Sequence, residues 1–485
     1  MEAALSNGTD REDGPAGRAP PPVEATWLRS IMADLRGGAV RRRLSSGIAR
    51  RLRALNGSAD ALSGETTEAL CNRLFVRASP GMSLACATEI LRRFAAADDA
   101  GKRAFLALLA ERYNADTERL TRAIERYRDD PAPERLAELH AASEPRRQQI
   151  LRRLNEAPDG TAMLLAMRGA LLAGDRAMPG FSALDSDFAH LFSAWFNGGF
   201  LELRRLDWSA PGAVLAKLMH YEAVHPIESW EALRARLEPA DRRCYGFFHP
   251  RMGHEPLIFV EVALTAGIPA RITDLLAPER AAMDPEQADT AVFYSISNCQ
   301  RALRGIPFGG PLIKQVMDLL RRELPSLRRA VTLSPMPGFA AWLREQGAAG
   351  TVDAALLAAL ERPGWHQDAV LGQWVQTPLM RAAATYLITA TGRRMDPVAR
   401  FHLGNGARIE QLDWLGDLSE KGLGQSHGMM VNYLYDPARI DGNLNAFARN
   451  GTVMASEQVR RLAASPAPAR LLGRMFSGGN GERER

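Results

Sequence analysis

The stretch Thr290-Ala-Val-Phe-Tyr-Ser-Ile-Ser-Asn-Cys-Gln-Arg-Ala-Leu-Arg-Gly-Ile-Pro-Phe-Gly-Gly310, followed by Pro311-Leu-Ile-Lys314, holds the clearest structural signal in this chain. Its apolar, β-branched and aromatic run 291–297 predicts a buried strand. A glycine-containing loop follows, and a helix is then expected from Pro311, because proline suits the first helical position. Free amides at a helix N-terminus attract anions. The sequence therefore predicts an anion site formed by Arg304, Gly305, Ile306, Pro307, Phe308, Gly309, Gly310 and Lys314.

The charges around this loop fit an anionic ligand. Lys314 falls in the first turn of the predicted helix, where the helix dipole disfavours a cation unless an anion lies nearby. Arg301 and Arg304 add positive charge beside the glycines. The alternative interpretation is a solvent-exposed connection between a strand and a helix, with ordinary glycines.

Composition limits the class of protein. The 485 residues are 46% hydrophobic and 24% charged, which is typical of a globular chain, and this length favours two domains. The net charge of +5 is modest, so we expect no nucleic-acid partner. It is compatible with a small anionic substrate.

The same composition bears on the compartment. The four cysteines show no metal-ligand or CxxC spacing, which favours a reducing compartment: Cys71, Cys86, Cys244 and Cys299. No apolar run is long enough to span a bilayer, and the N-terminal residues do not resemble a signal peptide. We therefore predict a cytoplasmic protein with no membrane partner.

Several short segments resemble the malonyl-CoA decarboxylase family. They are Phe293-Tyr-Ser-Ile-Ser297, Leu333-Ser-Pro-Met-Pro-Gly-Phe339, Phe401-His-Leu-Gly-Asn-Gly-Ala407, Asn432-Tyr-Leu-Tyr435 and Ala455-Ser-Glu-Gln-Val459. The resemblance implies decarboxylation of malonyl-CoA to acetyl-CoA and carbon dioxide without a metal or organic cofactor. It also implies a GNAT-like catalytic domain, similar to acyl-CoA acetyltransferases, behind a helical domain. A homo-oligomer, a tetramer in the family, is expected.

The domain organisation follows from pattern and resemblance together. We expect an α+β chain with a disordered tail at 1–24, a helical oligomerisation or interaction domain at 25–190, a GNAT-like mixed-sheet catalytic domain at 191–470 and a flexible tail at 471–485. Apolar alternation predicts strands at 244–249, 257–265, 291–297, 330–333 and 429–435. Helical periodicity predicts helices at 311–324 and 351–394.

Decarboxylation of a β-carbonyl thioester leaves an enolate, so the site needs hydrogen-bond donors and one general acid. By resemblance, His402 is the proton donor, and it is expected in a polar turn after a helix. Ser334, at a predicted strand end, is implied to contact the malonyl carboxylate; its other interpretation is a turn cap. Tyr435 either donates to the substrate or packs, and Asn432 is a weaker companion.

One position departs from the family pattern. Animal members place a glutamate in the phosphate loop where this chain has Pro307. Either that acid is dispensable or another replaces it, with Glu255 and Glu261 as candidates. A metal site at His249 and His254 is not expected, because no third ligand accompanies their spacing.

Two other functions remain open at this point. An acyl-CoA-dependent N-acetyltransferase would use the same phosphate loop. A non-catalytic acyl-CoA-binding regulator would also keep the loop. Ser334, His402 and Tyr435 in family motifs favour the decarboxylase over both.

Overall fold

The computed structural model describes residues 62–76, 79–306, 310–389 and 394–464. The predicted tails at 1–24 and 471–485 lie outside these residues. The chain divides into two compact units, one of residues 1–101 and 149–160, and a larger one of residues 102–148 and 161–485. Element type changes from helix to strand between 195 and 202, and the domain boundary at 190 stays a prediction.

The described residues of the smaller unit are mostly helical. It contains α3 (Thr67–Arg73), α4 (Pro80–Ala96) and most of α8 (Arg146–Glu156). Arg93 of α4 organises the start of this unit, because its guanidinium donates to the carbonyls of Leu62 at 2.9 Å and Glu65 at 2.6 Å. It also pairs with the buried Glu89 one turn earlier, at 2.7 Å.

Further helices precede the sheet. They are α5 (Asp99–Arg112), α6 (Thr117–Asp129), α7 (Pro133–Ser143), α9 (Gly160–Ala173) and α10 (Phe181–Trp195). Arg147 and Gln148 hold α10, because both side chains donate to the buried Asp187, Gln148 at 2.6 Å. No described helix is long and apolar enough to cross a membrane.

An eight-stranded mixed sheet forms the rest of the larger unit, in the order β1-β2-β3-β4-β5-β8-β6, with β7 also paired to β8. The strands are β1 (Glu202–Leu206), β2 (Arg242–Phe248), β3 (Pro256–Thr265), β4 (Thr290–Asn298), β5 (Arg329–Thr332), β6 (Ser334–Pro335), β7 (Arg408–Asp413) and β8 (Met430–Leu434). Only β4 and β5 run parallel; the other pairs are antiparallel. The strands predicted from apolar alternation are confirmed, whereas β1 and β7 were not predicted.

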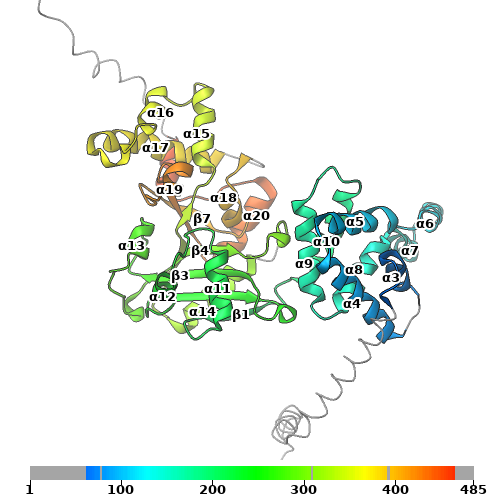
Figure 1. Cartoon of the computed structure of the whole chain (residues 1–485). Helices are drawn as coiled ribbons and strands as arrows, with labels where there is room; N and C mark the ends of the chain where they lie inside the picture. The colour runs from blue at the N-terminus through cyan, green and yellow to red at the C-terminus, as the bar shows by residue number, and fades with distance from the viewer. Residues whose placement is uncertain (1–61, 77–78, 307–309, 390–393, 465–485) are drawn as a thin grey trace, which may run out of the picture. The chain divides into compact units, whose positions relative to one another are not determined.

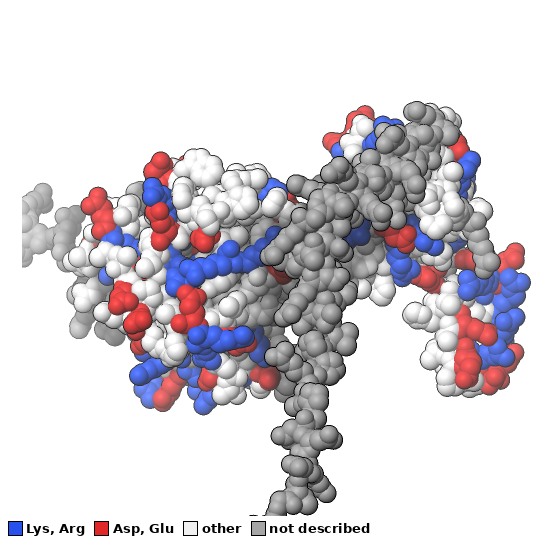
Figure 2. All heavy atoms as spheres, turned by 90° about the horizontal axis from the view of Figure 1, so that it is seen from below, with Lys and Arg blue, Asp and Glu red and all other residues white. Residues whose placement is uncertain are grey.

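Helices cover the sheet (Figure 1). Those of this part are α11 (Gly212–Tyr221), α12 (Trp230–Leu237), α13 (Ile272–Leu276), α14 (Gly310–Glu323), α15 (Phe339–Ala348), α16 (Ala354–Leu360), α17 (Ala369–Thr389), α18 (Pro397–Leu403), α19 (Glu420–Ser426), α20 (Ile440–Asn450) and α21 (Glu457–Ala464). One apolar cluster joins α11 and α12 to β2 and β3 through Leu218, Leu233, Cys244 and Phe259. On the face that Figure 2 shows, Lys and Arg side chains lie beside Asp and Glu.

The sheet opens between β4 and β5. The two strands are paired from Thr290 with Arg329 to Phe293 with Thr332. Beyond this point β4 continues to Asn298, whereas Ser334 pairs with Val431 of β8 instead. Pro335 and Pro337 lack the amide hydrogen that a ladder requires, so the strand cannot continue along β4. The described backbone of β4 after Phe293 therefore has no strand partner on this side.

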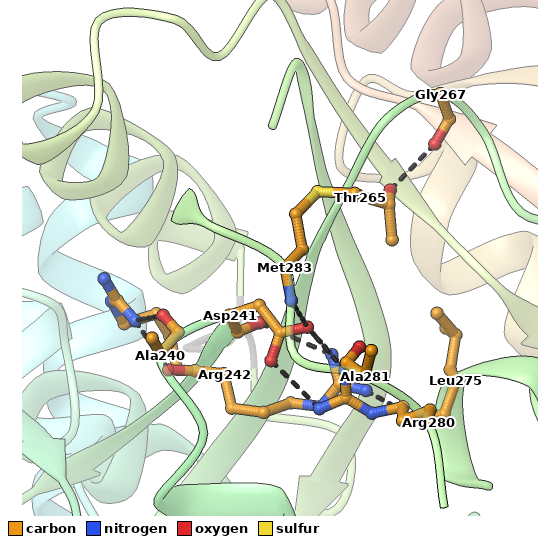
Figure 3. Close-up of polar contacts among 10 residues, drawn as sticks. Ala240, Asp241, Arg242, Thr265, Gly267, Leu275, Arg280, Ala281 and Met283 are labelled. Carbon is orange, nitrogen blue, oxygen red and sulfur yellow. Dashed lines mark hydrogen bonds and ion pairs between the residues drawn. The ribbon is translucent and has the colours of Figure 1, made fainter. Parts of the chain in front are cut away.

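A buried carboxylate fastens the long connection between β3 and β4 (Figure 3). Asp241 lies at the start of β2 and accepts hydrogen bonds from both Nη atoms of Arg280, one at 2.9 Å, and from the Met283 amide at 3.1 Å. The neighbouring Arg242 donates to the carbonyl of Leu275 in α13. The connection is thus tied to the sheet at two places.

The Asp241→Asn variant should be less stable than the parent by about 2–3 kcal/mol, because it leaves a partly buried guanidinium without its anion. Chemical denaturation measures this difference. Asp284→Asn, in the same connection, is the matched control: its carboxylate caps an exposed turn through the Glu286 amide, so the loss should stay below about 1 kcal/mol. Equal losses in the two variants would contradict the anchoring role of Asp241.

Candidate active site

Three predicted residues meet behind the opening of the sheet. The Oγ of Ser334 lies 3.1 Å from Nε2 of His402, and Nδ1 of His402 lies 2.9 Å from the hydroxyl of Tyr435. All three side chains are buried. Ser334 and His402 are 68 positions apart in the sequence, and His402 and Tyr435 are 33 apart. The fold, and not local sequence, therefore brings them together.

Local structure explains their positions. Ser334 is fixed by its pairing with Val431, and Tyr435 follows β8, where its amide donates to Ala330 at 2.9 Å. His402 lies in the last turn of α18, so the prediction of a polar turn after a helix was wrong. This helix begins at Pro397 after the N-cap Asp396, a typical N-cap and first-position pair, and no separate helix was predicted there.

Asp396 connects this helix to the serine segment. Its carboxylate accepts from the amides of Val398 and Ala399, which caps α18, and also from the Gly338 amide at 3.1 Å. The Tyr386 hydroxyl donates to the same carboxylate at 3.1 Å. One side chain therefore couples the helix that carries His402 to the segment that follows Ser334.

The hydrogen bonds give the site a direction. The Ser334 hydroxyl donates to Oγ1 of Thr332 at 2.8 Å, so it accepts from Nε2–H of His402. In this tautomer Nδ1 accepts from the Tyr435 hydroxyl. The chain of donors therefore runs from Tyr435 through His402 to Ser334. The ring of Tyr433 stacks on His402, with centroids 4.6 Å apart, and holds the imidazole in this plane.

Burial sets the charge state of the site. It lowers the pKa of His402 to about 3, with no other cause, and raises the pKa of Tyr435 well above its usual value. Both side chains are therefore neutral around pH 7. Among the described residues, no acidic side chain hydrogen-bonds to Ser334, His402 or Tyr435. The position that an aspartate takes beside many active-site histidines is taken here by a neutral phenol.

Neither candidate for the missing family acid contacts this cluster. Glu261 is fully buried and pairs with Arg236 at 3.1 Å, and burial raises its pKa to about 7. Glu255 pairs with Lys217 and accepts from the Tyr221 hydroxyl at 2.6 Å. Both carboxylates are committed to other partners. No group of three His, Cys, Asp or Glu that could hold a metal occurs among the described residues.

Asn432 lies on the other face of β8. Its amide donates to the carbonyls of Thr332 at 2.8 Å and Pro269 at 3.2 Å. Side chains alternate along a strand, so Asn432 points away from the face that carries Tyr433 and Tyr435. Its contacts hold the backbone of β5, and we do not include it among the residues that contact substrate.

The predicted order of strand, loop and helix at the anion site is present. β4 ends at Asn298, the turn η3 (Arg301–Leu303) follows, and α14 begins at Gly310. The side chains of Arg304 and Lys314 are exposed, Ile306 is buried, and Gly305 has a φ of 83°, which favours glycine. Pro307, Phe308 and Gly309 lie outside the described residues. Anion binding by this loop therefore stays a prediction.

Sequence reasoning missed three supporting residues. Thr332 stands two positions before Ser334, and Tyr433 two positions before Tyr435, so strand alternation would have placed each pair on one face. Asp396 before Pro397 carries the signature of a helix start. These signals were available, although none indicates which side chain the residue contacts.

Comparison with known proteins identifies the family of this chain. The family model described as "Malonyl-CoA decarboxylase C-terminal domain" matches residues 199–472, and the corresponding N-terminal domain model matches residues 113–196. The chain belongs to the malonyl-CoA decarboxylase family. The enzyme class predicted from the sequence is thereby confirmed. The predicted helical region before a mixed sheet is confirmed, and the GNAT-like character of the sheet domain stays an expectation from the family resemblance.

Individual relatives are similar over most of the chain. A protein of Anser anser anser named "Malonyl-CoA decarboxylase, mitochondrial" is 35% identical over 65% of this chain and 69% of its own length. The malonyl-CoA decarboxylase structures of Rhodopseudomonas palustris and Agrobacterium vitis are 49% and 48% identical, with TM-scores of 0.76 and 0.79. They cover 81% and 82% of this chain and 98% and 100% of their own chains.

The Asp396→Ala variant tests whether this carboxylate positions the site. It removes an acceptor from four donors, so stability should fall by about 2–4 kcal/mol and kcat should fall at least tenfold in the folded fraction. Denaturation and steady-state kinetics with malonyl-CoA measure the two effects. Asp353→Ala is the control, because Asp353 caps α16 through a single exposed amide. If Asp396→Ala keeps the parent kcat, the residue only caps its helix.

Proposed function

We propose that this chain decarboxylates malonyl-CoA to acetyl-CoA and carbon dioxide, with Ser334 contacting the carboxylate and His402 protonating the enolate. The observation that carries the proposal is the buried line of donors from Tyr435 through His402 to Ser334, without an acidic partner. Family membership supports the substrate.

The reaction requires no covalent bond between the protein and the substrate. The bond between the carboxylate carbon and the α-carbon breaks, and its electron pair becomes the enolate of the thioester. Carbon dioxide leaves, and the α-carbon then takes one proton. Each turnover consumes one proton from solvent. The protein must therefore orient the carboxylate, stabilise the enolate with hydrogen bonds, and deliver that proton.

Ser334 is suited to the first task. Its hydroxyl already accepts from His402, so rotation away from Thr332 directs its proton at an incoming carboxylate without breaking the bond to the imidazole. Such a bond to a charged group is stronger than one between neutral groups. Burial around Ser334 also excludes water, which strengthens the contact.

His402 is suited to the last task once substrate is bound. A neutral imidazole with a pKa of about 3 carries no proton to donate at pH 7 beyond its single N–H. A carboxylate placed beside Ser334 supplies the negative charge that the protein omits, and an opposite charge raises the pKa of a histidine. The ring then takes up one proton from solvent as the substrate binds, and the imidazolium gives this proton to the enolate carbon after carbon dioxide leaves, which returns the ring to its neutral form.

The opening of the sheet provides a path for the rest of the substrate. The unpaired edge of β4 after Phe293 offers backbone donors and acceptors to the amide groups of the pantetheine arm. The same strand leads into the loop before α14, where helix amides and Lys314 favour the CoA phosphates. This arrangement joins the thioester near Ser334 to the phosphates at the loop.

The rival functions predict different chemistry. An N-acetyltransferase needs a base to accept a proton from an amine, and a histidine with a pKa of about 3 is too weak for that. A non-catalytic regulator would bind malonyl-CoA without turnover. Incubation of the protein with malonyl-CoA separates all three: we expect stoichiometric acetyl-CoA and carbon dioxide, and their absence would overturn the proposal.

Ser334→Ala should keep CoA-thioester binding but lower kcat roughly tenfold to a hundredfold, the effect expected when a hydrogen bond to a charged group is lost.

His402→Asn should lower kcat about a hundredfold or more, the usual scale for a missing general acid. His190→Asn, an exposed histidine of α10, is the control for the second variant. Near-parent turnover in His402→Asn would move the proton source to Tyr435 or to water.

Lys314→Ala tests the phosphate site. The side chain is exposed, so the variant should fold normally, and KM for malonyl-CoA should rise about threefold to tenfold with kcat little changed. Arg322→Ala removes an exposed cation from the other end of the same helix and should leave KM unchanged. An identical KM in both variants would remove Lys314 from the site.

Two further predictions concern the protein in its cell. The cytoplasmic location inferred from the sequence stays a prediction, and the names of the animal relatives carry the word mitochondrial. The tetramer implied by the family likewise stays a prediction, which light scattering on the purified protein can test.

A further inference from the structure

An arginine of the helical region reaches the base of the phosphate loop. Arg168 lies on α9, is only 3% exposed, and donates through Nη1 to the carbonyls of Ala302 at 2.6 Å and Arg304 at 3.2 Å. Its Nε pairs with Asp185 of α10 at 2.8 Å. All four residues belong to the larger compact unit. The function described so far assigns no task to this side chain.

The carbonyls of Ala302 and Arg304 determine how the backbone amides at the start of the loop are oriented. In a trans peptide the C=O and the following N–H point in opposite directions. A guanidinium that holds the Arg304 carbonyl therefore turns the Gly305 amide the other way, at the first glycine of the loop. Gly305 has a φ of 83°, a conformation that requires glycine, so this turn is sharply bent.

The sheet restrains the other end of the same turn. The Gln300 side chain donates to the Glu255 carboxylate at 3.0 Å. The backbone amide of Gln300 donates to Oδ1 of Asn298 at 2.9 Å. These contacts lie before η3, whereas Arg168 holds the carbonyls within and after η3. The part of this connection from Gln300 to Arg304 is thus held by the sheet at its start and by α9 just before Gly305.

The chemistry of the contact favours arginine. A guanidinium presents several N–H groups in a fixed plane, so it can pair with a carboxylate and also donate to two carbonyls. A lysine ammonium is a point charge on a flexible stem and cannot fix this geometry.

We propose that Arg168 is a positioning residue for recognition of the CoA phosphates, which it achieves by holding the Ala302 and Arg304 carbonyls. This inference rests on the proposed function, in which the loop before α14 receives the phosphates. Arg168 acts through the loop backbone and does not touch the reacting atoms. Its loss therefore weakens binding of the nucleotide part of the substrate and leaves the chemistry at Ser334 and His402 unchanged.

Two substrates separate this effect from general damage. Malonyl-CoA carries the phosphates, whereas malonyl-pantetheine carries the same reacting group without them. Arg168→Met should raise KM for malonyl-CoA roughly tenfold or more, the scale of a lost charge-assisted hydrogen bond. Its kcat should stay within about twofold, and its kinetics with malonyl-pantetheine should equal those of the parent. Arg168→Lys should recover part of the affinity, because it keeps the cation beside Asp185.

The matched control is Arg147→Met. Arg147 is equally buried and pairs with Asp187, two positions from Asp185 on α10, but its other partner is Asn114 and not the loop. Arg147→Met should lower the thermal unfolding temperature as much as Arg168→Met does, and it should leave KM for both substrates unchanged. Calorimetric titration with CoA alone measures the same affinity difference without turnover.

The outcomes are distinguishable. If folded Arg168→Lys and Arg168→Met bind CoA as the parent does, or if Arg147→Met weakens CoA binding equally, the positioning role is overturned. If the parent itself processes malonyl-pantetheine as efficiently as malonyl-CoA, the phosphate site fails and the role of Arg168 fails with it. If the parent binds CoA through its phosphates but does not decarboxylate, the proposed activity fails while the Arg168 contact is still supported by calorimetry.

Discussion

The burial of His402 without an acidic partner is the constraint on which the site depends. A histidine enclosed by apolar and neutral groups loses the solvation of its cation, and its pKa falls to about 3. The neighbouring hydrogen bonds come from a phenol and a hydroxyl, neither of which compensates a positive charge. These three side chains therefore rest uncharged, and in the mechanism that we propose the substrate carboxylate supplies the missing negative charge.

The opening between β4 and β5 determines where Ser334 lies relative to His402 and Tyr435. Where the pairing stops, Ser334 turns to β8 and so comes next to the strand that presents Tyr433 and Tyr435. The unpaired continuation of β4 leads directly to the turn that Arg168 holds and on to α14. One interruption of the ladder, imposed by two prolines, thus positions Ser334 beside β8 and leaves the edge of β4 along which we propose that the substrate binds.

The sequence predicted the elements better than their contacts. The nearly continuous apolar runs at 257–265 and 291–297 identified β3 and β4, because a strand buried on two faces is apolar at most positions. The helix that carries His402 was missed because it is short, only seven residues, and its apolar face is narrow. Ser334, His402 and Tyr435 were chosen by resemblance; spacing alone does not bring them together. The Ala302 carbonyl that Arg168 holds lies more than 130 positions away in the sequence, and no local pattern predicts such a contact.

The most direct test of this account is the charge of His402 measured by ¹⁵N NMR of histidine-labelled protein, with and without a non-decarboxylating malonyl-CoA analogue that keeps the carboxylate. In the free enzyme the ring should remain neutral as the pH is lowered from 8 to about 4, since burial holds its pKa near 3. With the analogue bound, the ring should be protonated at pH values well above 4, because the carboxylate favours the cation. An imidazolium in the free enzyme at neutral pH, or a neutral ring in the complex throughout this range, would contradict the account.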